Sequence, residues 1–180
     1  MRPSALTIAL TSVLALSLAA CATKPKPMTV AEAPAPVAPS QGGEDYTPPS
    51  LDQGPVAQSL QQNLAATAGD RVFFALDSYQ LTAEARDILA AQAQWLAQHP
   101  NVRVMIAGNC DERGTREYNF ALGARRAASA RDFLVAQGVS SGRLATVSYG
   151  KEKPIDAGSD DTAWSRNRNA GTVIIDLAPQ

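Results

Sequence analysis

Residues 102–127 read VRVMIAGNCDERGTREYNFALGARRA, and their pattern of apolar and polar residues is the most informative about the fold. Apolar residues occupy alternate positions over 102–106, which predicts a strand. A polar loop follows over 108–114, and Thr115 then begins a long alanine-rich helix that is expected to reach about Gln137. A strand, a polar loop and a helix in succession are typical of a sheet with helices packed against it.

The flanking segments continue this alternation of helices and strands. Thr82 is expected to cap a helix that ends at His99-Pro100, because the residue before a proline resists helical geometry. Further predictions are a helix over 56–68 and strands over 72–76, 144–149 and 172–177. Together they indicate an α/β sandwich in which helices cover a sheet, with the order of the strands left open.

The N-terminus predicts export and lipidation. An apolar run within residues 1–20 is too short for a permanent membrane span, and it ends in Leu18-Ala-Ala-Cys21, which matches the bacterial lipoprotein signal. We expect cleavage before Cys21 and acylation of its thiol; the alternative is an ordinary signal peptide with a cysteine nearby by chance. Prolines recur through residues 21–55, which predicts an extended tether followed by a folded domain over 56–180.

Composition argues against several classes of function. With 180 residues and a net charge of -1, the chain has room for one domain and a tail, and it carries no basic field that would attract nucleic acid. It has one histidine, His99, and two cysteines. A zinc site or a histidine-based triad is therefore not expected, and no other cofactor is predicted.

Three residues of the long helix share one face. Asn119, Gly123 and Arg126 follow one another at the spacing i, i+4, i+7. Glycine inside a helix costs about 1 kcal/mol relative to alanine. Its presence at position 123 therefore indicates that something lies close to the helix backbone there.

Asp111 and Arg126 together suit a zwitterionic ligand. A carboxylate can accept hydrogen bonds from an ammonium group, and a guanidinium can bind a carboxylate through two parallel hydrogen bonds. The alternative is that Asp111 and Arg126 form an ordinary surface ion pair, with each other or with Glu112 and Arg125. Spacing does not decide between these two interpretations.

Several motifs of the chain resemble one known family. The stretch from Gly108 to Ala127, quoted above, closely resembles the peptidoglycan-associated lipoproteins of the OmpA C-terminal family. Further matching motifs are Leu76-Asp-Ser-Tyr79, Ser148-Tyr-Gly-Lys-Glu-Lys-Pro154 and Asn167-Arg168. The likeness covers about residues 70–177. It implies an α+β fold with a mixed four-stranded sheet packed by helices.

The resemblance also implies a ligand and a set of site residues. Proteins of this family bind the diaminopimelate of uncrosslinked peptidoglycan stem peptides, whose side chain ends in an ammonium and a carboxylate. By this resemblance Asp111 would bind the ammonium and Arg126 the carboxylate. Asn119 would add a hydrogen bond, Arg168 would border the pocket, and Asp77 would line it.

The resemblance implies a place in the cell as well. It indicates an outer-membrane lipoprotein whose domain faces the periplasm, which binds TolB and acts with the other Tol proteins to hold the outer membrane to the wall during division. Ala22 after the lipidated cysteine favours the outer membrane. The expected function is therefore binding, not catalysis. The alternatives are an enzyme that acts on the wall and a scaffold that contacts only proteins.

Three positions depart from the family pattern. Asn109 stands where the family usually has histidine, and it keeps a hydrogen-bonding side chain. Cys110 replaces alanine or threonine; with Cys21 acylated it has no disulfide partner, so we interpret it as a small buried residue, with a redox role as the alternative. Asn169 replaces an arginine, which puts a peripheral contact or a strand-edge ion pair in doubt, but not the central pair of Asp111 and Arg126.

Overall fold

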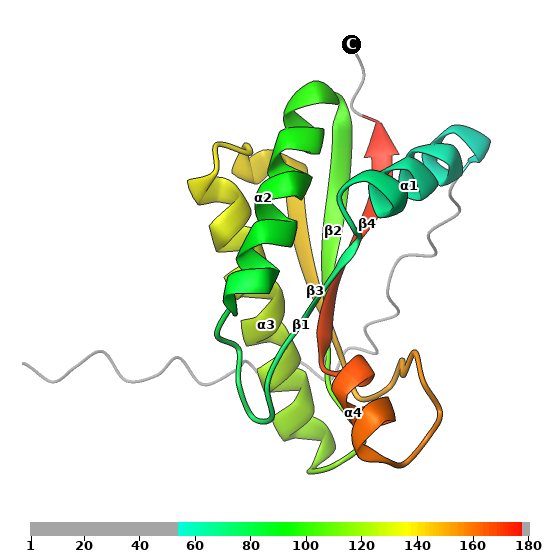
Figure 1. Ribbon diagram of the computed structural model, residues 1–180, viewed down its shortest axis with the longest axis vertical. Coiled ribbons are helices and arrows are strands. Elements are labelled where there is room, and N and C mark those ends of the chain that lie inside the picture. Colours follow the sequence, from blue (N-terminus) through cyan, green and yellow to red (C-terminus); the bar gives the residue numbers. More distant parts are fainter. Residues whose placement is uncertain (1–53, 178–180) are drawn as a thin grey trace, which may run out of the picture. The chain divides into compact units, whose positions relative to one another are not determined.

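A computed structural model describes residues 54–177 of the protein (Figure 1). The predicted signal segment, the predicted lipidation site Cys21 and nearly all of the predicted tether lie outside the described residues. The described elements, in chain order, are α1 (Pro55–Thr67), β1 (Arg71–Phe73), α2 (Ala83–Gln98), β2 (Val102–Asn109), α3 (Arg116–Ala136), a 3-10 turn (Ser141–Arg143), β3 (Leu144–Gly150), α4 (Asp161–Asn167) and β4 (Asn169–Leu177).

The strands form one mixed sheet in the order β1-β4-β2-β3. β4 pairs antiparallel with β1 and with β2, whereas β2 and β3 run parallel. Parallel neighbours need a long crossover connection, and α3 provides it. The predicted α+β fold, with a mixed four-stranded sheet packed by helices, is confirmed.

The main core lies between the sheet and the helices α2 and α3, which pack side by side (Figure 1). Alternate residues of β2 (Val102, Val104 and Ile106) belong to this core, together with Leu89 of α2 and Leu134 of α3. The intervening residues of β2 face the other side of the sheet, because side chains alternate along a strand. There, Met105, Ala107 and Val147 form a smaller apolar cluster.

The predicted helix starts are confirmed. Thr82 Oγ1 accepts a hydrogen bond from the Ala85 amide at 3.1 Å, and Thr115 Oγ1 accepts one from the Tyr118 amide at 3.2 Å. Each threonine thus pairs one of the amides that a helix leaves without a partner in its first turn. α3 ends at Ala136, and Gly138 has a φ of +96°, the left-handed conformation that commonly follows a helix.

Two sequence predictions differ from the structure. The strand predicted over 72–76 ends at Phe73, because the chain turns after Phe74 and the Ala75 carbonyl accepts a hydrogen bond from the Arg126 side chain instead of continuing a ladder. The short helix α4 was not predicted. It spans only seven residues, too few to show a periodic apolar pattern, although Asp160 caps it by accepting from the Ala163 amide at 2.8 Å.

A side chain of α1 completes the edge of β4 where the short strand β1 does not reach. Gln61 Nε2 donates to the Thr172 carbonyl at 3.1 Å, and Gln61 Oε1 accepts from the Ile174 amide at 2.8 Å. The amide group thus takes the place of a neighbouring strand's backbone. Leu64, also on α1, is fully buried in the main core, so the helix is bound to the sheet by both contacts.

Candidate functional site

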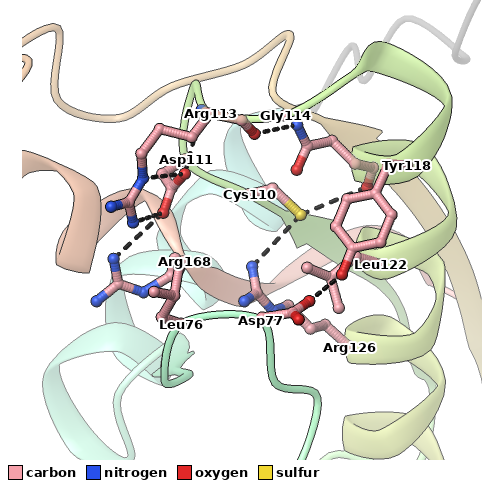
Figure 2. A pocket seen from close by; sticks show the side chains of 11 residues that line it. Leu76, Asp77, Cys110, Asp111, Arg113, Gly114, Tyr118, Leu122, Arg126 and Arg168 are labelled. Carbon is pink, nitrogen blue, oxygen red and sulfur yellow. Dashed lines mark hydrogen bonds and ion pairs between the residues drawn. The ribbon is translucent and has the colours of Figure 1, made fainter.

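A pocket of about 320 Å³ opens where β2 ends and α3 begins (Figure 2). All five predicted site residues line it, although they come from four separate segments of the chain. Its lining residues are Leu76, Asp77, Cys110, Asp111, Arg113, Gly114, Tyr118, Asn119, Leu122, Arg126 and Arg168. The structure therefore brings the predicted set together in one place, while the ligand role of each residue remains a prediction.

Asp111 lies in this pocket with both carboxylate oxygens occupied. Its Oδ1 accepts from the Arg113 amide at 3.2 Å and from Arg113 Nε at 3.1 Å. Its Oδ2 accepts from Arg113 Nη2 at 2.7 Å and from Arg168 Nη1 at 3.2 Å. Burial by itself would raise the pKa of Asp111, but the hydrogen bonds from Arg113 and Arg168 outweigh it and lower the pKa below its usual range.

Arg126 is fully buried, and backbone carbonyls hold its guanidinium group. Nε donates to the Ser78 carbonyl at 2.8 Å, Nη1 to the Asn109 carbonyl at 2.8 Å, and Nη2 to the Ala75 carbonyl at 3.1 Å. Nη1 also donates to Cys110 Sγ at 3.3 Å. Burial lowers the pKa of Arg126 from its usual value. Within residues 54–177, the alternative of an ordinary Asp111–Arg126 ion pair is wrong, because Asp111 pairs with Arg113 and Arg168.

The space at Gly123 is filled by the protein itself. A Cβ atom placed there would overlap Ser148 Oγ and would lie 2.9 Å from the carbonyl oxygen of Gly108. The close neighbours that the sequence indicated are therefore Gly108 of β2 and Ser148 of β3, packed directly against α3. Gly123 does not line the pocket.

Asn119, Arg168 and Asp77 each fix part of the pocket wall. Asn119 Nδ2 donates to the Arg113 carbonyl at 2.7 Å and so holds the loop that precedes α3. Arg168 Nε donates to the Phe74 carbonyl at 3.2 Å. Asp77 has a φ of +53°, unique among the non-glycine residues that the structure describes, and its carboxylate accepts from the Tyr118 hydroxyl. Non-glycine residues with this backbone conformation cluster at functional sites.

Arg113, Trp164 and Lys151 were not predicted as site residues. The Arg113 guanidinium lies 4.1 Å from the centre of the Trp164 ring, and Trp164 Nε1 donates to Glu112 Oε1 at 3.0 Å. Lys151 Nζ donates to the carbonyls of Glu112 and Gly114 at 3.1 and 2.9 Å. A signal for Arg113 was its position two residues after Asp111.

Two of the three departures from the family pattern contact each other. Asn109 Nδ2 donates to Asn169 Oδ1 at 2.9 Å, and Asn169 Oδ1 also accepts from Arg71 Nη1 at 3.0 Å. Asn169 is fully buried at the start of β4, so it is not a peripheral residue. The third departure, Cys110, is buried as predicted, and burial raises the pKa of its thiol.

The charges around the pocket favour an anionic or zwitterionic group. Three guanidinium groups (Arg113, Arg126 and Arg168) and two carboxylates (Asp77 and Asp111) line it, so three minus two leaves one positive charge. The part of the chain that the structure describes contains no group of three His, Cys, Asp or Glu residues that could hold a metal ion.

Sequence comparisons assign the chain to a family. The profile of the OmpA family matches residues 73–168. The chain is 52% identical over 124 residues to the peptidoglycan-associated lipoprotein of Rhizobium meliloti. The aligned region covers 69% of this chain and 70% of that protein. The chain is 45% identical over 159 residues to the one of Mesorhizobium japonicum, with coverages of 88% and 86%. The chain belongs to the peptidoglycan-associated lipoproteins of the OmpA family.

Solved structures agree with this family assignment. The crystal structure of the peptidoglycan-associated lipoprotein from Burkholderia pseudomallei has 43% sequence identity and a TM-score of 0.58, over 59% of this chain and 91% of that chain. The C-terminal domain of Helicobacter pylori MotB, at 20% identity, has a TM-score of 0.55 over 58% of this chain and 83% of that chain, which shows the OmpA-like fold alone. Within residues 54–177, no helix is both long and apolar enough to cross a membrane.

Proposed function

We propose that this protein is a non-catalytic outer-membrane lipoprotein that binds peptidoglycan noncovalently through the diaminopimelate of its stem peptides. In this proposal it links the outer membrane to the cell wall as part of the Tol–Pal system, in envelope integrity and cell division, with TolB among its protein partners. Its family membership and the names of its relatives support the proposal.

The proposal assigns a part to each segment of the chain. Residues 1–20 are removed, Cys21 carries the lipid, and the tether over 21–55 connects the outer membrane to a domain over 56–180 that faces the periplasm. One acyl chain gives only marginal membrane binding, so the several chains of a lipidated cysteine are what make the anchor stable. A tether rich in proline favours extended conformations, which suits a spacer between membrane and wall.

The observation that carries the proposal is an ionised, nearly buried carboxylate among three guanidinium groups. Asp111 is 5% exposed, and its hydrogen bonds keep it charged, so it can bind the ligand's ammonium group. Arg168 uses two of its five N–H groups within the described protein, which leaves three for the ligand's carboxylate. Arg126 uses four of its five and adds one N–H to the same carboxylate, as well as fixing the pocket wall.

Pull-down with purified cell-wall sacculi tests this assignment. We expect Asp111→Asn to lower the affinity at least about tenfold, because it removes a charge-assisted interaction and leaves the side-chain shape unchanged. Asp132→Asn is the matched control: Asp132 lies on α3, and its side chain is 65% exposed. Free diaminopimelate should compete with sacculi for the wild type. Equal binding by the two variants would contradict the proposal, provided both give the same circular dichroism.

A further inference from the structure

We propose that Arg113 competes with the ligand's ammonium group for Asp111, so that ligand binding is an exchange of one cation for another at this carboxylate. This inference rests on the proposed function, because it concerns the same site. It adds a residue that lowers the affinity for a ligand with an ammonium group.

The first observation is that Asp111 has no vacant acceptor position. Each of its two oxygens accepts two hydrogen bonds, and three of the four come from Arg113. An ammonium group that is to bind the carboxylate must therefore displace one of the two guanidinium groups. The bidentate side-chain contact from Arg113 Nε and Nη2 covers the edge of the carboxylate that faces this arginine (Figure 2).

The second observation is that Arg113 is the guanidinium with freedom to leave. Its side chain is 38% exposed, whereas that of Arg168 is 16% exposed and Arg126 is fully buried. Backbone carbonyls hold the other two: Phe74 accepts from Arg168, and three carbonyls accept from Arg126. The side-chain hydrogen bonds of Arg113 that the structure describes all go to Asp111.

The third observation is a place for Arg113 to stay once it is displaced. Its guanidinium already lies 4.1 Å from the centre of the Trp164 ring, and Glu112 fixes this ring through its indole N–H. A cation remains attracted to the face of a tryptophan without any hydrogen bond. The hydrogen bond to Asp111 is the main influence that raises the pKa of Arg113, and the nearby carboxylates of Asp161 and Glu112 add to it. These two carboxylates would stabilise the displaced guanidinium.

The exchange affects only a ligand that carries a cationic group. A ligand with a carboxylate but no ammonium cannot replace Arg113 at Asp111, so it gains nothing when Arg113 is removed. A ligand that carries the ammonium has to break the Asp111–Arg113 contact. It should therefore bind more tightly to a chain that lacks the competing guanidinium.

Calorimetric titration of the full chain in detergent tests this exchange. The probe is a muropeptide with a tripeptide stem that ends in meso-diaminopimelate, and the comparison probe is the same molecule with its free side-chain amine acetylated. We expect Arg113→Gln to bind the first probe about three- to fivefold more tightly than the wild type does, the change that corresponds to loss of a partly exposed ion pair. The acetylated probe should show no such gain.

Arg116→Gln is the matched control, because it removes the same charge close by in sequence, from a side chain that is 65% exposed and pairs with Glu152. Unchanged or weaker binding of the first probe by Arg113→Gln would overturn the exchange. If Asp111→Asn still abolished binding, the proposed function would stand and the exchange alone would fail. If the wild type did not bind the probe, both would fail.

Tryptophan fluorescence gives a second, independent measurement. The chain has two tryptophans, of which Trp95 is buried in the core and Trp164 contacts Arg113. Displacement of Arg113 should change the emission of Trp164 when the first probe is added to the wild type. The change should be absent in Trp164→Phe and in Arg113→Gln. A change of equal size in Arg113→Gln would contradict the exchange.

Discussion

Replacement of Arg126 by alanine should destabilise the domain as well as weaken the pocket. The guanidinium group donates to the carbonyls of Ala75, Ser78 and Asn109, and it is fully buried. Loss of each buried hydrogen bond costs about 1 to 1.5 kcal/mol, so three carbonyls give about 3 to 4.5 kcal/mol. Removal of a buried charge offsets part of this cost. We therefore expect a loss of about 3 kcal/mol in the free energy of unfolding.

Urea denaturation followed by circular dichroism measures this loss. Arg125→Ala is the control, because Arg125 is the preceding residue of the same helix, is exposed, and has its guanidinium 5.8 Å from the centre of the Tyr79 ring. It should change the free energy of unfolding by less than about 0.5 kcal/mol. Arg126→Lys keeps the charge and some of the donors, so its change in the free energy of unfolding should lie between those of Arg125→Ala and Arg126→Ala. A cost below about 1 kcal/mol for Arg126→Ala would refute the view that this side chain holds the pocket wall together.

Three further outcomes are expected from urea denaturation. The pKa of Asp111 is lower in the folded than in the unfolded chain, so its ionised form stabilises the fold at neutral pH. The wild type should therefore lose its higher free energy of unfolding, relative to Asp111→Asn, as the pH falls below about 4. Gly123→Ala should destabilise the fold by more than about 1 kcal/mol, despite the higher helix propensity of alanine, whereas the unhindered Gly142→Ala should not. Asn109→Ala and Asn169→Ala should be non-additive by about 1 kcal/mol, since the two amides contact each other; additive costs would contradict that contact.

Local sequence patterns predicted most of the fold. The alternation over 102–106 and the caps at Thr82 and Thr115 correspond to β2, α2 and α3. These features depend on residues close together in the chain, and a single sequence records them directly. One of the two predictions that differ depends on a distant contact: β1 ends early because the chain turns toward Arg126, which is far along the sequence. The other concerns α4, which is too short to show a periodic pattern.

For the candidate site, too, the sequence predicted which residues take part but not the contacts between distant residues. Resemblance to the family identified five of the residues that line the pocket, but spacing alone did not show how they pair. Asp111 pairs with Arg113, two residues away, and with Arg168, which reaches it only through the antiparallel position of β4 beside β2. The contact between Asn109 and Asn169 also depends on strand order, which periodicity does not contain.

The attachment of α1 to the sheet edge through Gln61 has a mechanical consequence. A pull on the chain before Pro55 enters the domain at α1, whose Gln61 is attached to the middle of β4, at Thr172 and Ile174. If the pocket is held at the same time, the force runs along the length of the strands, and the hydrogen bonds between β4 and β2 share it in parallel. The contacts of Gln61 and Leu64 would break first, so α1 would detach from the sheet and lengthen the chain before the domain. The strands would remain paired and would keep the pocket intact.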